Sequence, residues 1–162
     1  MKFHVVNALT KLTLLGAMLI VPTVVSVHAQ SLQYRIKANI PFEFSVGDKK
    51  LQAGKYSFGR AREGSDDTIL SVDDLAGHWK AIGASSSVQT LAIKKRPQLI
   101  FHRYGDQYFL FQVWSAGAST GRQFLKSKQE SELERTYVAN ASSGKIHQKN
   151  LVEIVTIAGL ER

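Results

Sequence analysis

Residues 99–114 read LIFHRYGDQYFLFQVW, and this stretch decides the predicted fold. Two apolar runs, 99–103 and 108–114, flank Gly105-Asp106, and a Gly-Asp pair between apolar runs is typical of a tight hairpin turn. The second run carries apolar residues on both faces, which predicts a central strand covered from both sides. We therefore expect this hairpin to form the centre of the core.

Shorter strands are predicted on both sides of this hairpin. Residues 34–40 and 42–46 alternate apolar and polar side chains with period two, and Pro41 divides them. Turn residues at Gly47-Asp48 and Ala53-Gly54 separate these strands from the next ones. Further strands are predicted at 56–58, 68–72, 78–83, 88–93 and 151–157. Small or polar residues predict turns or loops at 73–77, 115–121 and 140–150.

One short helix is predicted near residues 128–136. Ser127 followed three residues later by Glu130 forms a capping box. Leu133 and Tyr137 share a helical face and are expected to lie against the sheet. Together these elements predict an all-β fold, either an antiparallel β-sandwich or a partly open barrel of about seven to nine strands.

The first 29 residues resemble a signal peptide. Lys2 and Lys11 give a basic start, residues 12–27 are apolar, and Val27-His28-Ala29 precedes Gln30 in the pattern that signal peptidases read. We expect cleavage between Ala29 and Gln30, a periplasmic or extracellular location, and no stable membrane insertion afterwards. Removing 29 of the 162 residues leaves 133, which fits one β-rich domain, residues 30–162. The alternative is an uncleaved anchor.

Charge and cysteine content narrow the function classes. The net charge is +8, and the leader holds two lysines and no acid, so the remaining chain carries +6. This surplus favours anionic partners, and no nucleic acid is expected. The alternative is that the surplus serves simple solubility, because the charges are scattered. The chain has no cysteine, which excludes disulfides, thiolate zinc sites, a cysteine nucleophile and a lipidated cysteine.

The candidate ligand-binding residues cluster around the central turn. They are His102, Arg103, Tyr104, Asp106 and Tyr108, which could converge on an anionic or sugar ligand. The alternative is that the aromatic residues complete the core while Arg103 and Asp106 pair in solvent. Trp79 and Trp114 are further candidates for stacking on sugars, with Trp114 expected to be buried because it ends an apolar strand.

No assembled catalytic or metal-binding motif occurs in the sequence. The histidines lack ligand spacing and are expected at the surface or in turns, and no Gly-x-Ser-x-Gly pentapeptide is present. The acidic pairs Asp66-Asp67 and Asp73-Asp74 are attributed to turn formation, and Glu130 to helix capping. We expect no catalytic residues, no metal and no cofactor.

Three stretches carry a resemblance to a known family. They are NIPFEFSVG at 39–47, LQAGKY at 51–56 and FHRYGDQYFL at 101–110, and the similarity extends through residues 121–130. The chain resembles a family of small exported bacterial proteins without an assigned activity, whose members usually have Leu-Pro-Ala-Gly where this chain has Leu51-Gln52-Ala53-Gly54. The resemblance implies export and an all-β fold, and it implies no site residue.

These observations favour a non-enzymatic exported β-domain that binds another exported protein or an anionic surface polymer. One alternative is a small hydrolase of cell-wall or extracellular polymers, with His102 and Asp106 or the acids of residues 130–134 as reacting groups. A second alternative is a structural subunit that assembles through its sheet edges. A shared concave pocket around the acids and His102 would favour the hydrolase.

Overall fold

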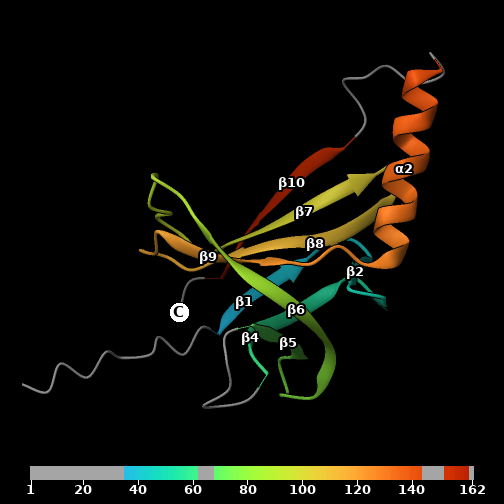
Figure 1. The fold of residues 1–162 in the computed structure, drawn as a ribbon. Coiled ribbons are helices and arrows are strands. Elements are labelled where there is room, and N and C mark those ends of the chain that lie inside the picture. The colour runs from blue at the N-terminus through green and yellow to red at the C-terminus, as the bar shows by residue number, and fades with distance from the viewer. Residues whose placement is uncertain (1–34, 62–67, 144–151, 161–162) are drawn as a thin grey trace, which may run out of the picture. The chain divides into compact units, whose positions relative to one another are not determined.

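A computed structural model describes residues 35–61, 68–143 and 152–160, all within one unit of the chain, Leu32–Arg162. The predicted leader with its cleavage point at Ala29 and Gln30, Asp66-Asp67 and most of the polar loop 140–150 lie outside these ranges. Within them, the chain forms ten strands and one helix (Figure 1). Their bounds are β1 Ile36–Ile40, β2 Phe44–Val46, β3 Lys49–Leu51, β4 Gly54–Arg60, β5 Ile69–Asp74, β6 Trp79–Gln89, β7 Gln98–Tyr104, β8 Gln107–Trp114, β9 Thr120–Phe124, α2 Lys128–Ser142 and β10 Glu153–Ala158.

The strands form one large open sheet, which confirms the all-β prediction with a single helix. The main path runs β1-β4-β5-β6-β9-β8-β2-β3, while β7 joins β8 to β10. All pairs are antiparallel except β2 with β8, which run parallel and meet at Ser45 and Phe109. The sheet is therefore mixed rather than purely antiparallel. Just after β10, the Leu160 backbone N–H donates a hydrogen bond of 2.7 Å to the Lys37 carbonyl oxygen of β1.

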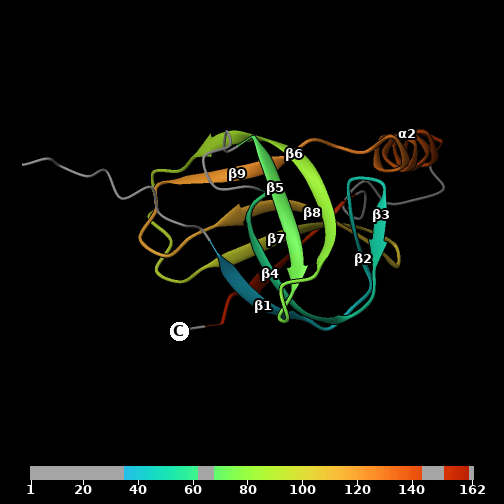
Figure 2. The same cartoon turned by 90° about the horizontal axis from the view of Figure 1, so that it is seen from below.

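Strand β6 belongs to two ladders. Its first half, up to Ala84, pairs with β5, and its second half, from Ser85 to Gln89, pairs with β9. Figure 2 shows β4, β5 and β6 side by side, with β9 following the far end of β6. Each half of β6 thus has one edge without a neighbouring strand, and a hollow lies beside each half.

The core consists of the inward faces of these strands. Along β1, the residues Ile36, Ala38 and Ile40 are buried and alternate with exposed Lys37 and Asn39, as a half-wetted strand requires. From the central hairpin, Leu99 and Phe101 are fully buried. The predicted role of this hairpin as the centre of the core is therefore confirmed.

The predicted turn at Gly105 is also confirmed. Gly105 has φ of +60°, a conformation that side-chain-bearing residues rarely adopt. A Cβ at this position would also lie 2.7 Å from the Tyr137 hydroxyl oxygen on α2. Glycine is therefore required here both by the turn and by the approach of the helix.

Several predicted boundaries were wrong. No strand spans 88–93: β6 ends at Gln89, and residues 90–97 are irregular. The predicted loop 115–121 runs into β9, which was missed because its sequence, TGRQF, lacks an apolar run.

The predicted turn 73–77 begins too early, since Asp73 lies in β5, is 7% exposed and accepts hydrogen bonds from Arg35 and Ser71. The helix continues to Ser142, past the predicted end at residue 136, because no breaker follows.

No helix in the described part of the chain is long and apolar enough to cross a bilayer.

Candidate functional site

The five predicted ligand-binding residues of the hairpin do not converge. Adjacent residues of a strand point to opposite faces, so His102 and Tyr104 lie under α2, whereas Arg103 lies on the other face. There the Arg103 guanidinium stands 5.4 Å from the Tyr108 ring and 3.0 Å from a Glu153 carboxylate oxygen. The predicted alternative, an exposed Arg103 beside Asp106, agrees with their separation of 3.9 Å and the full exposure of the Asp106 side chain.

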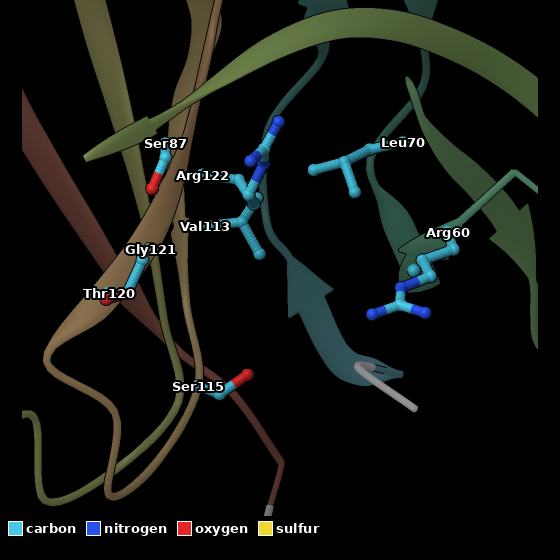
Figure 3. Close-up of a pocket in the computed structure, with 9 residues that line it drawn as sticks. Arg60, Leu70, Ser87, Val113, Ser115, Thr120, Gly121 and Arg122 are labelled. Carbon is cyan, nitrogen blue, oxygen red and sulfur yellow. The ribbon is translucent and has the colours of Figure 1, made fainter. Parts of the chain in front are cut away.

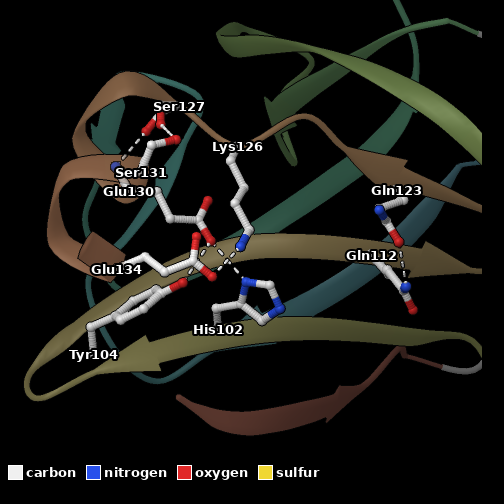
Figure 4. Close-up of polar contacts among 9 residues, drawn as sticks. All are labelled: His102, Tyr104, Gln112, Gln123, Lys126, Ser127, Glu130, Ser131 and Glu134. Atoms are coloured by element: carbon white, nitrogen blue, oxygen red, sulfur yellow. Dashed lines mark hydrogen bonds and ion pairs between the residues drawn. The ribbon is translucent and has the colours of Figure 1, made fainter. Parts of the chain in front are cut away.

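The face under α2 carries a buried polar cluster (Figure 4). One carboxylate oxygen of Glu130, Oε1, lies 2.7 Å from His102 Nδ1 and accepts a longer hydrogen bond, 3.4 Å, from the Tyr104 hydroxyl. An ionised carboxylate only accepts, so His102 Nδ1 is the donor when Glu130 is ionised. The His102 ring stacks on Phe111 at a centroid distance of 3.8 Å. Glu130 is 4% exposed and His102 is 8% exposed, so the expected surface position of His102 was wrong.

The start of α2 places Glu130 over the hairpin. Ser127 caps the helix as predicted, since its hydroxyl oxygen accepts a hydrogen bond of 3.1 Å from the Glu130 backbone N–H. The Glu130 carboxylate reaches His102 across the interface with β7. An acid in the first helical turn also interacts favourably with the helix dipole. The capping box was visible in the sequence, but the partner of its acid was not.

The side chain of Tyr104 is buried with the rest of this cluster, at 1% exposure. Burial raises the pKa of Tyr104, and the negative charges of Glu130 and Glu134 add to the effect. Tyr104 also packs edge-to-face against Phe109 and Tyr137. The phenol therefore stays protonated and remains a hydrogen-bond donor to Glu130.

Of the reacting groups expected for a hydrolase, the structure brings His102 and Glu130 together and leaves Asp106 apart from them. Asp106 lies exposed at the turn while His102 is buried. Of the three acids on α2, Glu130 bonds His102, Glu134 pairs with Lys126 at 2.6 Å, and Glu132 faces solvent. Among the described residues, no three histidine or acidic side chains are grouped as a metal site would require.

An open groove lies between the β2–β3 hairpin and the first half of β6. Its volume is about 630 Å³, and its lining residues are Val46, Asp48, Lys49, Leu51, Trp79, Lys80, Ala81 and Ile82. Val46, Leu51 and Ala81 are buried and give it an apolar floor. Trp79 is 61% exposed and Ile82 is 48% exposed. Exposed apolar side chains that lie together over an apolar floor mark interaction sites, so the groove is a candidate binding surface.

Charged groups flank Trp79 in this groove. Lys80 Nζ lies 3.1 Å from an Asp74 carboxylate oxygen, and hydrogen bonding from the His78 backbone N–H lowers the pKa of Asp74. Lys49 and Asp48 lie on the opposite side, at and after the hairpin turn. The groove therefore offers an exposed ring with cationic and anionic hydrogen-bonding groups around it.

A smaller cavity lies beside the second half of β6 (Figure 3). Its volume is about 120 Å³, and it is lined by Gly59, Arg60, Leu70, Ser87, Val113, Ser115, Thr120, Gly121 and Arg122. Arg122 and Val113 stand on one side, and Arg60 and Leu70 on the other. Sequence reasoning missed this cavity because its residues come from five strands and the two arginines lie 62 positions apart in the sequence.

Comparisons of the chain with protein families, curated proteins and solved structures found no match. The resemblance to small exported bacterial proteins therefore stays a prediction. The candidate sites are therefore assigned from the geometry of the described residues alone.

Proposed function

We propose that this protein is an exported, non-catalytic β-domain that binds an acidic polysaccharide through the groove at Trp79. The proposal combines the signal-peptide pattern of residues 1–29 with the exposed ring on the groove wall. The single observation that carries it is the exposure of Trp79 above an apolar floor. An open groove can hold one segment of a polymer that extends beyond it.

The chemistry of the groove fits a sugar ring with a carboxylate. The flat apolar face of a sugar can pack on the Trp79 indole, while ring hydroxyls exchange hydrogen bonds with charged side chains. Lys49 lies exposed on the β3 edge and can pair with a carboxylate of the polymer. The net charge of the chain without its leader adds long-range attraction for an anionic polymer.

The same edge supports the polysaccharide proposal over self-assembly. Strand β3 is only three residues long and carries Lys49 and Lys50. Short edges with lysines disfavour pairing with another sheet. A concentration-independent sedimentation coefficient is the expected result for the purified chain.

Affinity electrophoresis of the purified chain tests the proposal. We expect retardation in gels that contain polygalacturonate and none in gels that contain neutral dextran. Trp79→Ala should weaken the retardation about tenfold, since an aromatic contact is worth about 1–1.5 kcal/mol. Leu91→Ala is the matched control, because Leu91 is fully exposed outside the groove. Equal retardation of the Trp79→Ala and unaltered chains, or no retardation at all, would refute the proposal.

A further inference from the structure

The loop between β6 and β7, residues 90–97, carries two aliphatic side chains that lie in solvent. Leu91 is fully exposed and Ile93 is 61% exposed. A single exposed aliphatic residue is ordinary on a protein surface, but two at one loop tip form a local apolar patch of the kind that marks an interaction site. Because no strand continues past Gln89, neither side chain has a place in the core.

Backbone hydrogen bonds hold this loop on both sides of its tip. The Thr90 N–H donates to the Ser119 carbonyl oxygen at 2.9 Å, and the Gly117 N–H donates to the Lys94 carbonyl oxygen at 2.8 Å. Ser119 and Gly117 belong to the loop between β8 and β9, so the two loops support each other. The tip, residues 91–93, lies between these two bonds and is therefore held in an exposed position before any partner binds.

Basic side chains adjoin the apolar tip. Lys95 is exposed, and the structure gives it no ion pair with another described residue. Lys94 Nζ lies 5.6 Å from the centre of the Trp114 ring, which keeps this ammonium group at the base of the loop. None of the residues of the two loops, 90–97 and 115–119, is acidic. The loop therefore combines exposed aliphatic groups with positive charge.

The tip is distant from both the groove and the polar cluster. Strand β6 begins at Trp79, on the groove, and ends at Gln89, directly before the loop. Strand β7 begins at Gln98, directly after the loop, and ends at Tyr104, under α2. The loop thus lies at the end of the sheet opposite to α2 (Figure 1). It is a separate surface, and an inference about it does not depend on the polysaccharide proposal.

We propose that this loop binds the surface of an anionic lipid bilayer, with Leu91 and Ile93 at the boundary between headgroups and acyl chains. Such a surface matches both parts of the loop, because aliphatic side chains leave water there while lysines pair with lipid phosphates at the headgroup level. A polysaccharide offers the charges without an apolar layer. The contact is shallow and reversible, since two side chains bury less apolar surface than a lipid anchor does.

A fluorescent label on the loop tests this proposal in the full chain. Because the chain has no cysteine, Ala92→Cys provides one position for a nitrobenzoxadiazole label, directly between Leu91 and Ile93. We expect the emission to brighten and shift to the blue with vesicles of equimolar phosphatidylcholine and phosphatidylglycerol, and to change little with pure phosphatidylcholine.

A second labelling position separates the loop from the rest of the chain. Ala139→Cys, at an exposed position of α2, is the matched control, and its label should show no shift with either kind of vesicle. The label reports only on its own surroundings. Binding of the apolar leader to a vesicle would therefore not imitate the result expected at position 92.

Substitutions in the labelled chain test the two parts of the surface. Leu91→Ser should raise the lipid concentration needed for half of the emission change about tenfold, because the burial of one leucine is lost. Lys95→Gln should raise it about fivefold, the effect of one basic residue near an anionic membrane. Ile154→Ser and Lys128→Gln, at exposed positions near α2, are the matched controls and should leave it unchanged. Circular dichroism verifies that each variant is folded.

Four results would overturn the proposal. The first is no emission change at position 92 with the anionic vesicles at about 1 mM lipid, roughly ten times the concentration at which a single myristoyl chain is half bound. The second is an equal change with neutral and anionic vesicles, which would make the lysines irrelevant. The third is an equal change at positions 92 and 139. The fourth is an unchanged response in both Leu91→Ser and Lys95→Gln.

The groove at Trp79 provides the remaining control. Polygalacturonate should not change the emission of the label at position 92, and Trp79→Ala should leave the response to anionic vesicles intact. Failure of the lipid proposal and failure of the polysaccharide proposal are therefore distinguishable.

Discussion

The polar cluster under α2 and Arg122 beside the small cavity are both held by hydrogen bonds, but the cluster is buried and Arg122 is only half-buried. Under α2, Glu130 accepts from both His102 and Tyr104, and aromatic rings close over the cluster. At the cavity, Ser85 occupies one edge of the Arg122 guanidinium, and space remains beside it. A buried polar group with all its partners in place stabilises the fold, whereas a charged group that water still reaches contributes less.

Among the polar residues, the largest expected effect is on the completed cluster. Glu130→Ala leaves two buried donors, on His102 and Tyr104, without their acceptor, and each such group costs about 1–3 kcal/mol. We expect the free energy of unfolding to fall by about 3 kcal/mol, as measured by urea unfolding followed by circular dichroism. Glu132→Ala, an exposed acid on the same helix, should change it by less than about 0.5 kcal/mol. Equal effects of the two substitutions would show that the cluster is not structural.

Packing, rather than polar bonding, should dominate stability at the cavity end. A Cβ on Gly121 would lie 2.6 Å from the ring of Trp114, which is 3% exposed. Gly121→Ala therefore forces the indole to move, and overpacking of this kind costs about 1–3 kcal/mol. Gly117→Ala is not a suitable control because its φ is +74°. Ser119→Ala, at an exposed position of the loop before β9, serves instead. An unchanged melting temperature for Gly121→Ala would contradict the described packing.

The protonation of Tyr104 gives a test that is specific to the cluster. Burial raises the pKa of Tyr104 above its ordinary value of 10.0, so above about pH 10 the folded chain keeps a proton that the unfolded chain loses. The folded state then binds more protons, and the free energy of unfolding falls as the pH rises.

Tyr104→Phe should remove the part of the fall in unfolding free energy at high pH that Tyr104 causes. At neutral pH it should cost about 1 kcal/mol, the usual value of one hydrogen bond. Urea unfolding of both chains near pH 8 and near pH 11 measures the difference. If the two chains differ in stability by the same amount at both pH values, the pKa of Tyr104 is not raised by burial.

The smallest effect on stability is expected in the groove. Trp79 is mostly exposed, so Trp79→Ala should change the free energy of unfolding by less than about 0.5 kcal/mol while it weakens polysaccharide binding. Trp114→Ala is the comparison, because removal of a buried tryptophan costs about 3–5 kcal/mol. Similar losses of stability at the two positions would mean that Trp79 is a packing residue and not a binding one.

Much of the fold could be predicted because its signals are local. The alternation around Pro41, the turn at Gly105 and the cap at Ser127 each depend on a few neighbouring residues. Strand β9 escaped prediction because Arg122 is an inward-facing charged residue, and a polar inward position erases the alternation. The weak strand predicted at 88–93 was wrong for a related reason: its apolar residues Leu91 and Ile93 are exposed rather than buried.

The sequence by itself determined the strand-rich architecture, the central hairpin and the start of the helix, because period-two alternation, turn residues and capping residues act over a few positions. The tertiary structure alone decided that Glu130 meets His102 across 28 positions and that Ser85 fixes Arg122 across 37. It also decided that Trp79 is exposed, whereas the burial of Trp114 was predicted from its apolar strand and is confirmed. Such contacts depend on how strands pair over long distances, and the identity of a residue does not state which distant residue will lie beside it.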